Sequence, residues 1–327
     1  MKRFIGFLLV FIALGCGDDV IVPPPREDPT LITPPTLPPA DPTQPPEFVL
    51  EWGEFGSDPG QFYQPTEIEI GPDGTVYVLD NQNERVQKFS RDGEFILEWG
   101  NSGPRENYFT NLLDAIAIHE DRIYVSDILA ARTLVFSDQG NLLQAWDFFA
   151  VHGGLDTDPA GNVYLSGFKV ISRTFPMITE GPFVWKLTPE GGEIEKYDLG
   201  VRSIVLDEKG NLYGISHDFI GELPQASVTK FTGTGEFLAR WDLRDESTSL
   251  FDDLAVDARG FLYVCNRSTS SLFKFAPDGE VLSEWSALDD RRGVIGWPAG
   301  IAVDSDRNVF VSDFEKHRII KYGYLRN

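Results

Sequence analysis

Short runs of alternating apolar and polar residues, separated by turns rich in Asp and Gly, fill the chain after residue 47. The stretch from Pro65 to Trp99 shows the pattern most clearly. It reads TEIEI, TVYVLD, RVQKF and EFILEW, with turns such as PDG and RDG between the runs. Alternating β-branched and aromatic residues between such turns are typical of antiparallel hairpins. This stretch therefore predicts a four-stranded antiparallel sheet.

The same unit recurs along the chain. An aromatic residue in its second strand returns about every 40 to 50 residues, which is the length of one propeller blade. In five units a glycine precedes a large aromatic residue by six positions, as Gly93 precedes Trp99. The second-strand positions are Tyr77, Tyr124, Tyr164, Tyr213, Tyr263 and Phe310. The repeat predicts an all-β fold, a six-bladed β-propeller of four-stranded antiparallel blades.

The sixth unit ends before its last strand. The missing strand has a close copy at the start of the domain, where EFVLEW at 47–52 repeats EFILEW at 94–99. We expect this N-terminal strand to complete the last blade, because ring closure removes sheet edges that would otherwise pair with other strands.

These motifs resemble the NHL-repeat family of six-bladed β-propellers. The matching marks are PAGIAVD at 298–304, Y-V-x-D in the second strand, and D-x-x-x-x-R runs at 80–89 and 313–322. The likeness covers about residues 48–327, although Gly167 and Ser216 stand where the family has Asp. It implies the fold but not one function, since the family includes ligand-binding scaffolds, protein-interaction modules, RNA binders and a few metal enzymes.

The N-terminus predicts export. Residues 1–15 carry Lys2 and Arg3 before an apolar run that is too short to span a membrane, which is typical of a signal peptide. The sequence ALGC at 13–16 is similar to a bacterial lipobox and predicts lipidation of Cys16. The alternative is an ordinary secretory signal with an incidental cysteine. The expected location is the bacterial cell envelope, as a lipoprotein anchored to a membrane.

A proline-rich segment follows at residues 16–46, and the propeller occupies residues 47–327. Eleven of the 22 prolines lie between residues 17 and 47, without apolar periodicity, which predicts a disordered, extended tether. Only two cysteines occur, so no disulfide framework is available. The net charge of −23 argues against nucleic acid as a partner. We expect a monomer that meets the membrane only through its lipid.

Charged or titratable residues precede the apolar core of the first strand in five units. In a propeller these first strands surround the central channel, and the loops entering them lie at its mouth. The sixth unit has only Ala299 and Gly300 at this point. The candidate ligand-binding residues are Glu67, Asp114, His152, Arg202, Asp252 and Asp253.

Two interpretations of this group remain open. In one, the carboxylates bind a polar ligand or a hard cation such as Ca²⁺ or Mg²⁺, which prefer oxygen ligands. In the other, they are solvated residues at the channel mouth. Zinc is disfavoured because His152 is the only one of four histidines at a channel position. This also weakens the comparison with amidating lyases of the family, which use several channel histidines, whereas lactonase-like propellers use carboxylates and a divalent metal.

Other features are assigned to structure or to binding. Asp80, Asp127 and Asp313, each followed five residues later by arginine, recur within the repeat and predict a salt bridge across a turn. Such a bridge contributes little if it is exposed, on the order of 0–1 kcal/mol. Insertions at 167–182 and 216–226 interrupt the third and fourth units. The first is apolar, which suggests a lid over the channel, a docking patch for a protein partner, or local packing.

No P-loop, G-x-S-x-G, H-E-x-x-H or C-x-x-C motif is present. The leading hypothesis is a non-catalytic, surface-tethered module that binds a small polar ligand or an envelope protein through the channel-mouth loops. The alternative is a lyase or hydrolase, lactonase-like or amidating-lyase-like, that depends on a divalent metal at the channel carboxylates.

Overall fold

The computed structural model describes residues 43–100, 109, 112–147, 150–172, 178–220, 223–243, 251–286 and 294–324. The predicted signal peptide (1–15), the lipidation site Cys16 and the tether (16–46), apart from its last residues 43–46, lie outside this set. The described residues contain one short 3₁₀ helix, η1 (Asn81–Asn83), and no helix with the length and hydrophobicity of a membrane span.

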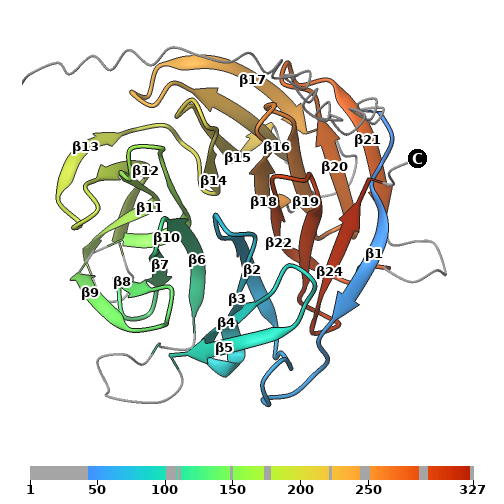
Figure 1. The fold of residues 1–327 in the computed structure, drawn as a ribbon. Helices are drawn as coiled ribbons and strands as arrows, with labels where there is room; N and C mark the ends of the chain where they lie inside the picture. Colours follow the sequence, from blue (N-terminus) through green and yellow to red (C-terminus); the bar gives the residue numbers. More distant parts are fainter. Residues whose placement is uncertain are drawn as a thin grey trace, which may run out of the picture. The chain divides into compact units, whose positions relative to one another are not determined.

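Six four-stranded antiparallel sheets form the blades of a propeller (Figure 1). In each sheet the first strand lies nearest the centre and the fourth lies at the outside. The first three blades are β2 (Pro65–Ile70), β3 (Val76–Asp80), β4 (Arg85–Phe89) and β5 (Phe95–Trp99); β6 (Leu113–His119), β7 (Arg122–Asp127), β8 (Arg132–Ser137) and β9 (Leu142–Asp147); and β10 (Ala150–Thr157), β11 (Val163–Ser172), β12 (Ile178–Leu187) and β13 (Glu193–Tyr197).

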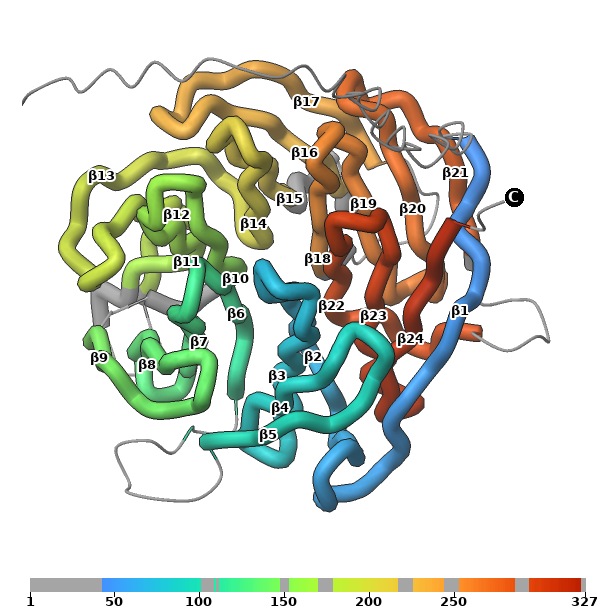
Figure 2. Tube along the Cα trace, in the orientation of Figure 1, coloured from blue at the N-terminus to red at the C-terminus, as the bar shows by residue number. Residues whose placement is uncertain are grey.

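The remaining blades complete the ring. They are β14 (Ile204–Leu206), β15 (Leu212–Ile220), β16 (Leu223–Phe231) and β17 (Phe237–Leu243); β18 (Phe251–Val256), β19 (Leu262–Asn266), β20 (Ser271–Phe275) and β21 (Val281–Ser286); and β22 (Pro298–Val303), β23 (Val309–Asp313), β24 (Arg318–Gly323) and β1 (Glu47–Trp52). Strand β1 pairs antiparallel with β24, so the N-terminal strand completes the last blade as the sequence predicts. Figure 2 shows its blue trace beside the red C-terminal strands.

The hydrophobic core lies between neighbouring blades. Both faces of a blade are covered, so the second and third strands are largely buried, and β3 and β4 of the first blade are buried at every position. The outermost strand β5 is largely exposed until it reaches Trp99. That tryptophan packs against Phe136 of the second blade, with the ring centroids 5.9 Å apart. The stability of the ring therefore rests on contacts from each blade to the next.

The repeated glycine and aromatic residue meet across this interface. Gly93 of the first blade lies beneath the ring of Trp52 from the last blade, and Gly140 lies beneath Trp99. Both glycines have positive φ, at 82° and 73°, where a side chain is strained. The pattern thus records two requirements: a left-handed turn and a close approach of the neighbouring aromatic ring.

Replacement of Gly93 by alanine tests the second requirement. Gly74 is a matched control because it has the same φ of 82° and no atom within 4 Å of an added Cβ, whereas a Cβ on Gly93 would lie 2.8 Å from the Trp52 ring. We expect Gly74→Ala to cost about 1–2 kcal/mol for the backbone alone. Gly93→Ala should cost about 1–3 kcal/mol more, for overpacking. Urea unfolding measures both, and equal costs would exclude the role of the ring.

The two predicted insertions lengthen hairpins. Strands β11 and β12 pair as far as Ser172 and Ile178, and β15 and β16 pair as far as Ile220 and Leu223. Most residues of both segments therefore belong to strands, because they continue the sheet ladder. The functions suggested for these insertions, a lid or a docking patch, stay predictions, since the tips at 173–177 and 221–222 lie outside the described residues.

The predicted Asp–Arg bridges form in the first, second and last blades. Arg85, Arg132 and Arg318 each contact the aspartate five residues before them. Their aspartates are fully buried, and Arg85 is itself only 1% exposed. Because their aspartates are buried, these bridges are not the weak, exposed surface pairs considered in the sequence analysis.

Candidate functional site

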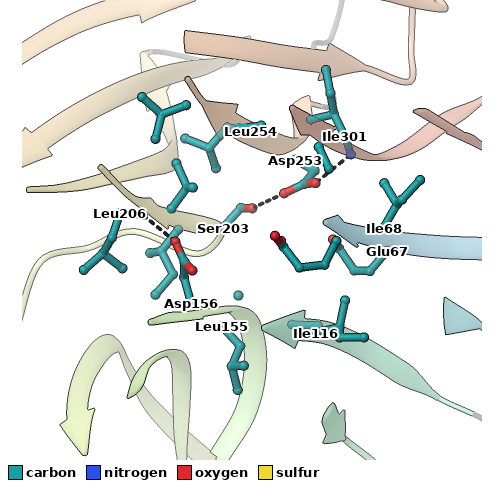
Figure 3. Close-up of a pocket in the computed structure, with 18 of the residues that line it drawn as sticks. Glu67, Ile68, Ile116, Leu155, Asp156, Ser203, Leu206, Asp253, Leu254 and Ile301 are labelled. Carbon is teal, nitrogen blue, oxygen red and sulfur yellow. Dashed lines mark hydrogen bonds between the residues drawn. The ribbon is translucent and has the colours of Figure 1, made fainter. Parts of the chain in front are cut away.

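The six first strands surround a cavity of about 150 Å³ at the centre of the ring (Figure 3). Each blade contributes a short stretch of its first strand to the lining. Four acidic side chains lie among aliphatic ones. The lining comprises Glu67, Ile68, Glu69, Ala115, Ile116, Gly154, Leu155, Asp156, Ser203, Ile204, Val205, Leu206, Asp253, Leu254, Ala255, Val256, Ile301, Ala302 and Val303.

Bulges in the first strands explain which residues reach the cavity. The register shifts between Pro65 and Ile68 in β2, and comparable shifts interrupt β6, β10, β18 and β22. A bulge places two residues opposite one and re-aims their side chains. The second residue of each bulge directly precedes an aliphatic residue of the strand. In the first blade this bulge residue is Glu67, before Ile68, and in the fifth it is Asp253, before Leu254.

Two blades have no room for a side chain at this same position. The third and last blades carry Gly154 and Gly300 there. A Cβ on Gly154 would lie 2.7 Å from the backbone nitrogen of Ile204, and one on Gly300 would lie 2.5 Å from the backbone oxygen of Thr66. The strands approach too closely for any larger residue. The carboxylates therefore come from blades whose neighbours leave space for them.

Asp253 joins three blades at the cavity wall. Its Oδ2 accepts a hydrogen bond from the backbone amide of Ile301 at 2.9 Å, and its Oδ1 accepts one from the hydroxyl of Ser203 at 3.2 Å. Figure 3 shows this side chain between the two donors, with Glu67 directed toward the same space. These donors hold the carboxylate in place.

A second acidic pair extends the site along the channel. Asp156 of β10 accepts hydrogen bonds from the backbone amides of Leu206 at 2.6 Å and Thr157 at 2.7 Å. Glu69 of β2 lies near enough for the Asp156 charge to raise its pKa. Glu69 accepts one backbone hydrogen bond, from Ile70 at 3.1 Å. Glu69 has fewer hydrogen-bond donors than Asp156, so its ionised form is less well stabilised.

Burial raises the pKa of every carboxyl in this group, because a low-dielectric environment disfavours the charged form. The pKa of Glu69 rises to about 8 and that of Asp156 to about 7. The pKa values of Asp114 and Asp253 rise to about 6. Glu67 shifts well above its usual range, through burial first and then through repulsion from Asp253 and Asp114. Several of these groups are therefore protonated near neutral pH.

Glu67 and Asp253 act as one titrating pair. A hydrogen bond between them raises the pKa of Glu67 and lowers that of Asp253, so Glu67 holds the proton and donates it to the Asp253 carboxylate. No Lys, Arg or His occurs among the described residues that line the cavity. The negative charge of the cavity is thus reduced by protonation of its carboxyls and not by basic side chains in the described lining.

The candidate residues fall into three groups in the structure. Glu67 and Asp253 line the cavity. Asp114 does not line it, but its charge acts on Glu67. Arg202 is exposed and lies over the ring of Phe168, 5.1 Å from its centroid. The backbones of His152 and Asp252 belong to β10 and β18, and their side chains lie outside the described part of the chain.

Two lining carboxyls, Glu69 and Asp156, escaped the sequence prediction, which considered only the residues before each aliphatic position. Strand alternation carried the missing signal for Glu69. Residues two apart in a strand face the same way, so Glu69 follows Glu67 toward the cavity. Asp156 occupies the same position relative to Leu155 as Glu69 does to Ile68. A comparison of both flanks of the aliphatic residue would have found the pair.

The structure leaves the Ca²⁺ or Mg²⁺ prediction open. Oxygen ligands suit these ions, yet within the described ranges no three His, Cys, Asp or Glu side chains are grouped closely enough to hold a metal. At the bulges of β2 and β6, however, Oγ1 of Thr66 and Oδ2 of Asp114 are buried and have no hydrogen-bond partner. They occupy equivalent first bulge positions in adjacent blades. Such unsatisfied atoms are where a ligand or water is expected.

Comparison with known proteins bears mainly on the fold. Residues 296–322, in the last blade, match the NHL repeat. No match to the chain occurs among curated proteins. A catalytically inactive virginiamycin B lyase from Staphylococcus aureus, solved with quinupristin, is similar with a TM-score of 0.58 and 12% identity, over 85% of this chain and 100% of that one.

Two further solved structures show the same likeness. A gluconolactonase from Xanthomonas campestris has a TM-score of 0.57 and 14% identity, over 88% of this chain and 98% of that one. Kuenenia stuttgartiensis hydrazine synthase has a TM-score of 0.58 and 12% identity, over 81% and 97%. At these identities the likeness establishes the propeller architecture alone.

Proposed function

We propose that the protein is an envelope-anchored binding module that takes a small cationic ligand into the central cavity. The observation that carries this proposal is a cavity with four lining carboxyls and no basic residue among its described lining. A cation would replace the protons that these buried groups now hold. The sequence analysis predicts a polar ligand, and the acidic lining favours a polar ligand with a positive charge.

The anchoring part of the proposal rests on the sequence of residues 1–46. Signal peptidase would cleave before Cys16, the cysteine would carry the lipid, and the tether would hold the propeller away from the membrane. Labelling of cells with a radioactive fatty acid tests this directly. Loss of the label in Cys16→Ser is the expected result, and unchanged labelling would exclude lipidation at this residue.

Tetramethylammonium is a suitable probe for the cavity. We expect it to raise the melting temperature of the full-length chain, since a ligand at 100 times its dissociation constant stabilises the native state by about 2.7 kcal/mol. The affinity should rise between pH 5.5 and pH 8.5, because carboxyls with pKa values of about 6 to 8 ionise in this window. Thermal unfolding at a series of probe concentrations and pH values measures both effects.

Variants localise the effect to the cavity. Glu67→Gln and Asp253→Asn should weaken tetramethylammonium binding, whereas Glu208→Gln, on an exposed turn, should leave it unchanged. A melting temperature that does not respond to the probe at any pH would overturn the proposal. A response that persists in both cavity variants would place the binding elsewhere.

A metal-dependent lyase or hydrolase is the second candidate. The observation that favours it is the combination of channel carboxyls with a fold similar to those of a virginiamycin B lyase and a gluconolactonase. In this case Mg²⁺ or Ca²⁺, rather than tetramethylammonium, would stabilise the protein, and Asp253→Asn would abolish the shift. Metal-dependent hydrolysis of a lactone or metal-dependent cleavage of quinupristin would then establish the activity.

A further inference from the structure

The four lining carboxyls form two layers along the channel. One aliphatic residue of each first strand occupies the same position in every blade, since it pairs with the residue after the repeated aromatic of the second strand: Ile68, Ile116, Leu155, Ile204, Leu254 and Ile301. Glu67 and Asp253 directly precede this position, and we call them the first layer. Glu69 and Asp156 directly follow it, and we call them the second layer.

Each layer pairs a glutamate of β2 with an aspartate that is held by the next blade. Asp253 accepts a hydrogen bond from the amide of Ile301 at 2.9 Å, and Asp156 accepts one from the amide of Leu206 at 2.6 Å. Among the neighbouring charges, Asp253 contributes most to the raised pKa of Glu67. Asp156 does the same for Glu69. The two carboxyls of each layer are therefore close neighbours.

Two residues separate the layers, as Glu67 and Glu69 show on the same strand. A strand advances by 3.2–3.4 Å per residue, so the two layers lie about 6–7 Å apart along the channel. The other blades contribute small or aliphatic residues to the same positions, such as Gly154 in the first layer and Ala302 in the second. The negative charge of the cavity is thus concentrated at two heights.

A further carboxyl lies beside the first layer. Asp114 comes one residue before the first-layer position of the second blade, and its pKa is raised by burial and by the charge of Asp253. Its Oδ2 is buried and has no hydrogen-bond partner. A buried polar atom without a partner marks a place where a donor is expected. In the described residues, the first layer therefore has more acceptors than donors.

We propose, resting on the cation-binding function above, that the ligand is a linear diamine with one ammonium group in each layer. The nitrogens of extended 1,4-diaminobutane are about 6 Å apart, because five single bonds of about 1.5 Å join them in a zigzag. Each ammonium group offers three donors to the carboxyl oxygens. The methylene groups lie beside the aliphatic residues between the layers, and the cavity volume of about 150 Å³ suits so short a chain. A single metal ion can occupy only one layer.

Pentylamine is the matched probe, because it has a methyl group in place of one ammonium group of 1,4-diaminobutane. At pH 8.5 alkylamines are protonated, with pKa values of about 10. The second layer, with pKa values of about 8 and about 7, is then largely ionised. We expect 1,4-diaminobutane to bind the full-length chain at least about tenfold more tightly than pentylamine in isothermal titration calorimetry, since hydrogen bonds between charged groups are the strong ones.

Variants of the second layer localise the second ammonium group. Glu69→Gln/Asp156→Asn should remove the preference for 1,4-diaminobutane over pentylamine, and Glu69→Gln alone should reduce it. Asparagine keeps an oxygen that can accept the hydrogen bond from Leu206. Glu208→Gln/Asp278→Asn is the matched control, because it changes the net charge by the same amount on exposed turns and should keep the preference.

The spacing of the two layers has its own control. The nitrogens of extended 1,8-diaminooctane are about 11 Å apart, too far for both layers, so this diamine should bind less tightly than 1,4-diaminobutane. Equal affinity of the two diamines would indicate a general attraction of dications and would overturn the inference. Equal affinity of 1,4-diaminobutane and pentylamine would also overturn it, while cation binding by the cavity stands. No binding of any ammonium probe, tetramethylammonium included, would overturn both proposals.

Discussion

Replacement of Arg85 by alanine should destabilise the propeller by about 3–5 kcal/mol, because it leaves a buried carboxylate without its ionic partner. The guanidinium donates to Oδ2 of Asp80 at 2.8 Å and to Oε2 of Glu98 at 2.6 Å. Neither Arg85 nor Asp80 is more than 1% exposed. The charge that remains on Asp80 could not be solvated without local opening of the first blade.

The same guanidinium fastens a loop. Its remaining donors go to the backbone carbonyls of Ser57, Asp58 and Gln61, at 2.8, 3.1 and 2.8 Å. All five N–H groups of the arginine are therefore used. The loop connects the closing strand β1 to the first strand β2. Loss of Arg85 should accordingly weaken ring closure as well as the ion pair.

Arg91→Ala is the matched control for this prediction. Arg91 contacts the last blade, at Asp306 (2.6 Å) and at the buried Asp304 (3.2 Å), but the side chains of Arg91 and Asp306 are both 44% exposed. A pair open to solvent should contribute no more than about 1 kcal/mol. Arg85→Lys keeps the charge but not the planar fork, and its cost should fall between the two. Urea unfolding of the three variants gives the order, and similar costs for Arg85→Ala and Arg91→Ala would contradict the structural role.

The fold was predictable because the same strand and turn pattern occurs in six units of the sequence. Strand positions, turn glycines and the exchange of the last outer strand to the N-terminus all follow from residues that recur at the same spacing. The sequence predicts only part of the role of Gly93 and Gly140, namely that they lie in turns. The sequence shows each glycine beside the aromatic residue of its own blade, whereas its packing partner is the aromatic residue of the blade before.

The site was predictable only in part, because it depends on how single strands deviate from the repeat. Alignment by sequence treated Asp114 as the counterpart of Glu67. The bulge of β6 instead places Ala115 at that position and Asp114 one residue earlier. The buried state of the Asp80–Arg85 pair depends on a loop that folds back over it, from residues more than 20 positions away. A periodic pattern contains no information about such a contact.

Glu69→Gln should stabilise the protein at pH 8, by about 2–4 kcal/mol, and should change its stability little at pH 4.5. The unfolded chain ionises this carboxyl near its ordinary pKa of 4.5, whereas the native pKa is about 8. Between these values the native state binds more protons than the unfolded state. The free energy of unfolding must therefore fall as the pH rises from about 4.5 to about 8.

The limits of this window fix the sign of the effect. Below pH 4.5 the carboxyl is protonated in both states and contributes no penalty. Above pH 8 it is ionised in both, and the full cost of its burial beside Asp156 remains. Asp156, with a native pKa of about 7, and Asp253, at about 6, act in the same direction over narrower windows. The wild-type protein should therefore be most stable in mildly acidic solution.

Urea unfolding between pH 4.5 and pH 8.5 measures this effect, with Glu94→Gln on an exposed turn as the control. Curves for wild type and Glu69→Gln that stay parallel across the window would contradict the prediction. The same measurement connects stability to binding. A cation in the cavity would stabilise the ionised carboxylates, so tetramethylammonium at pH 8 should reduce the difference between wild type and Glu69→Gln. The burial that destabilises the ionised carboxylates is thus what would make the cavity attract a cation.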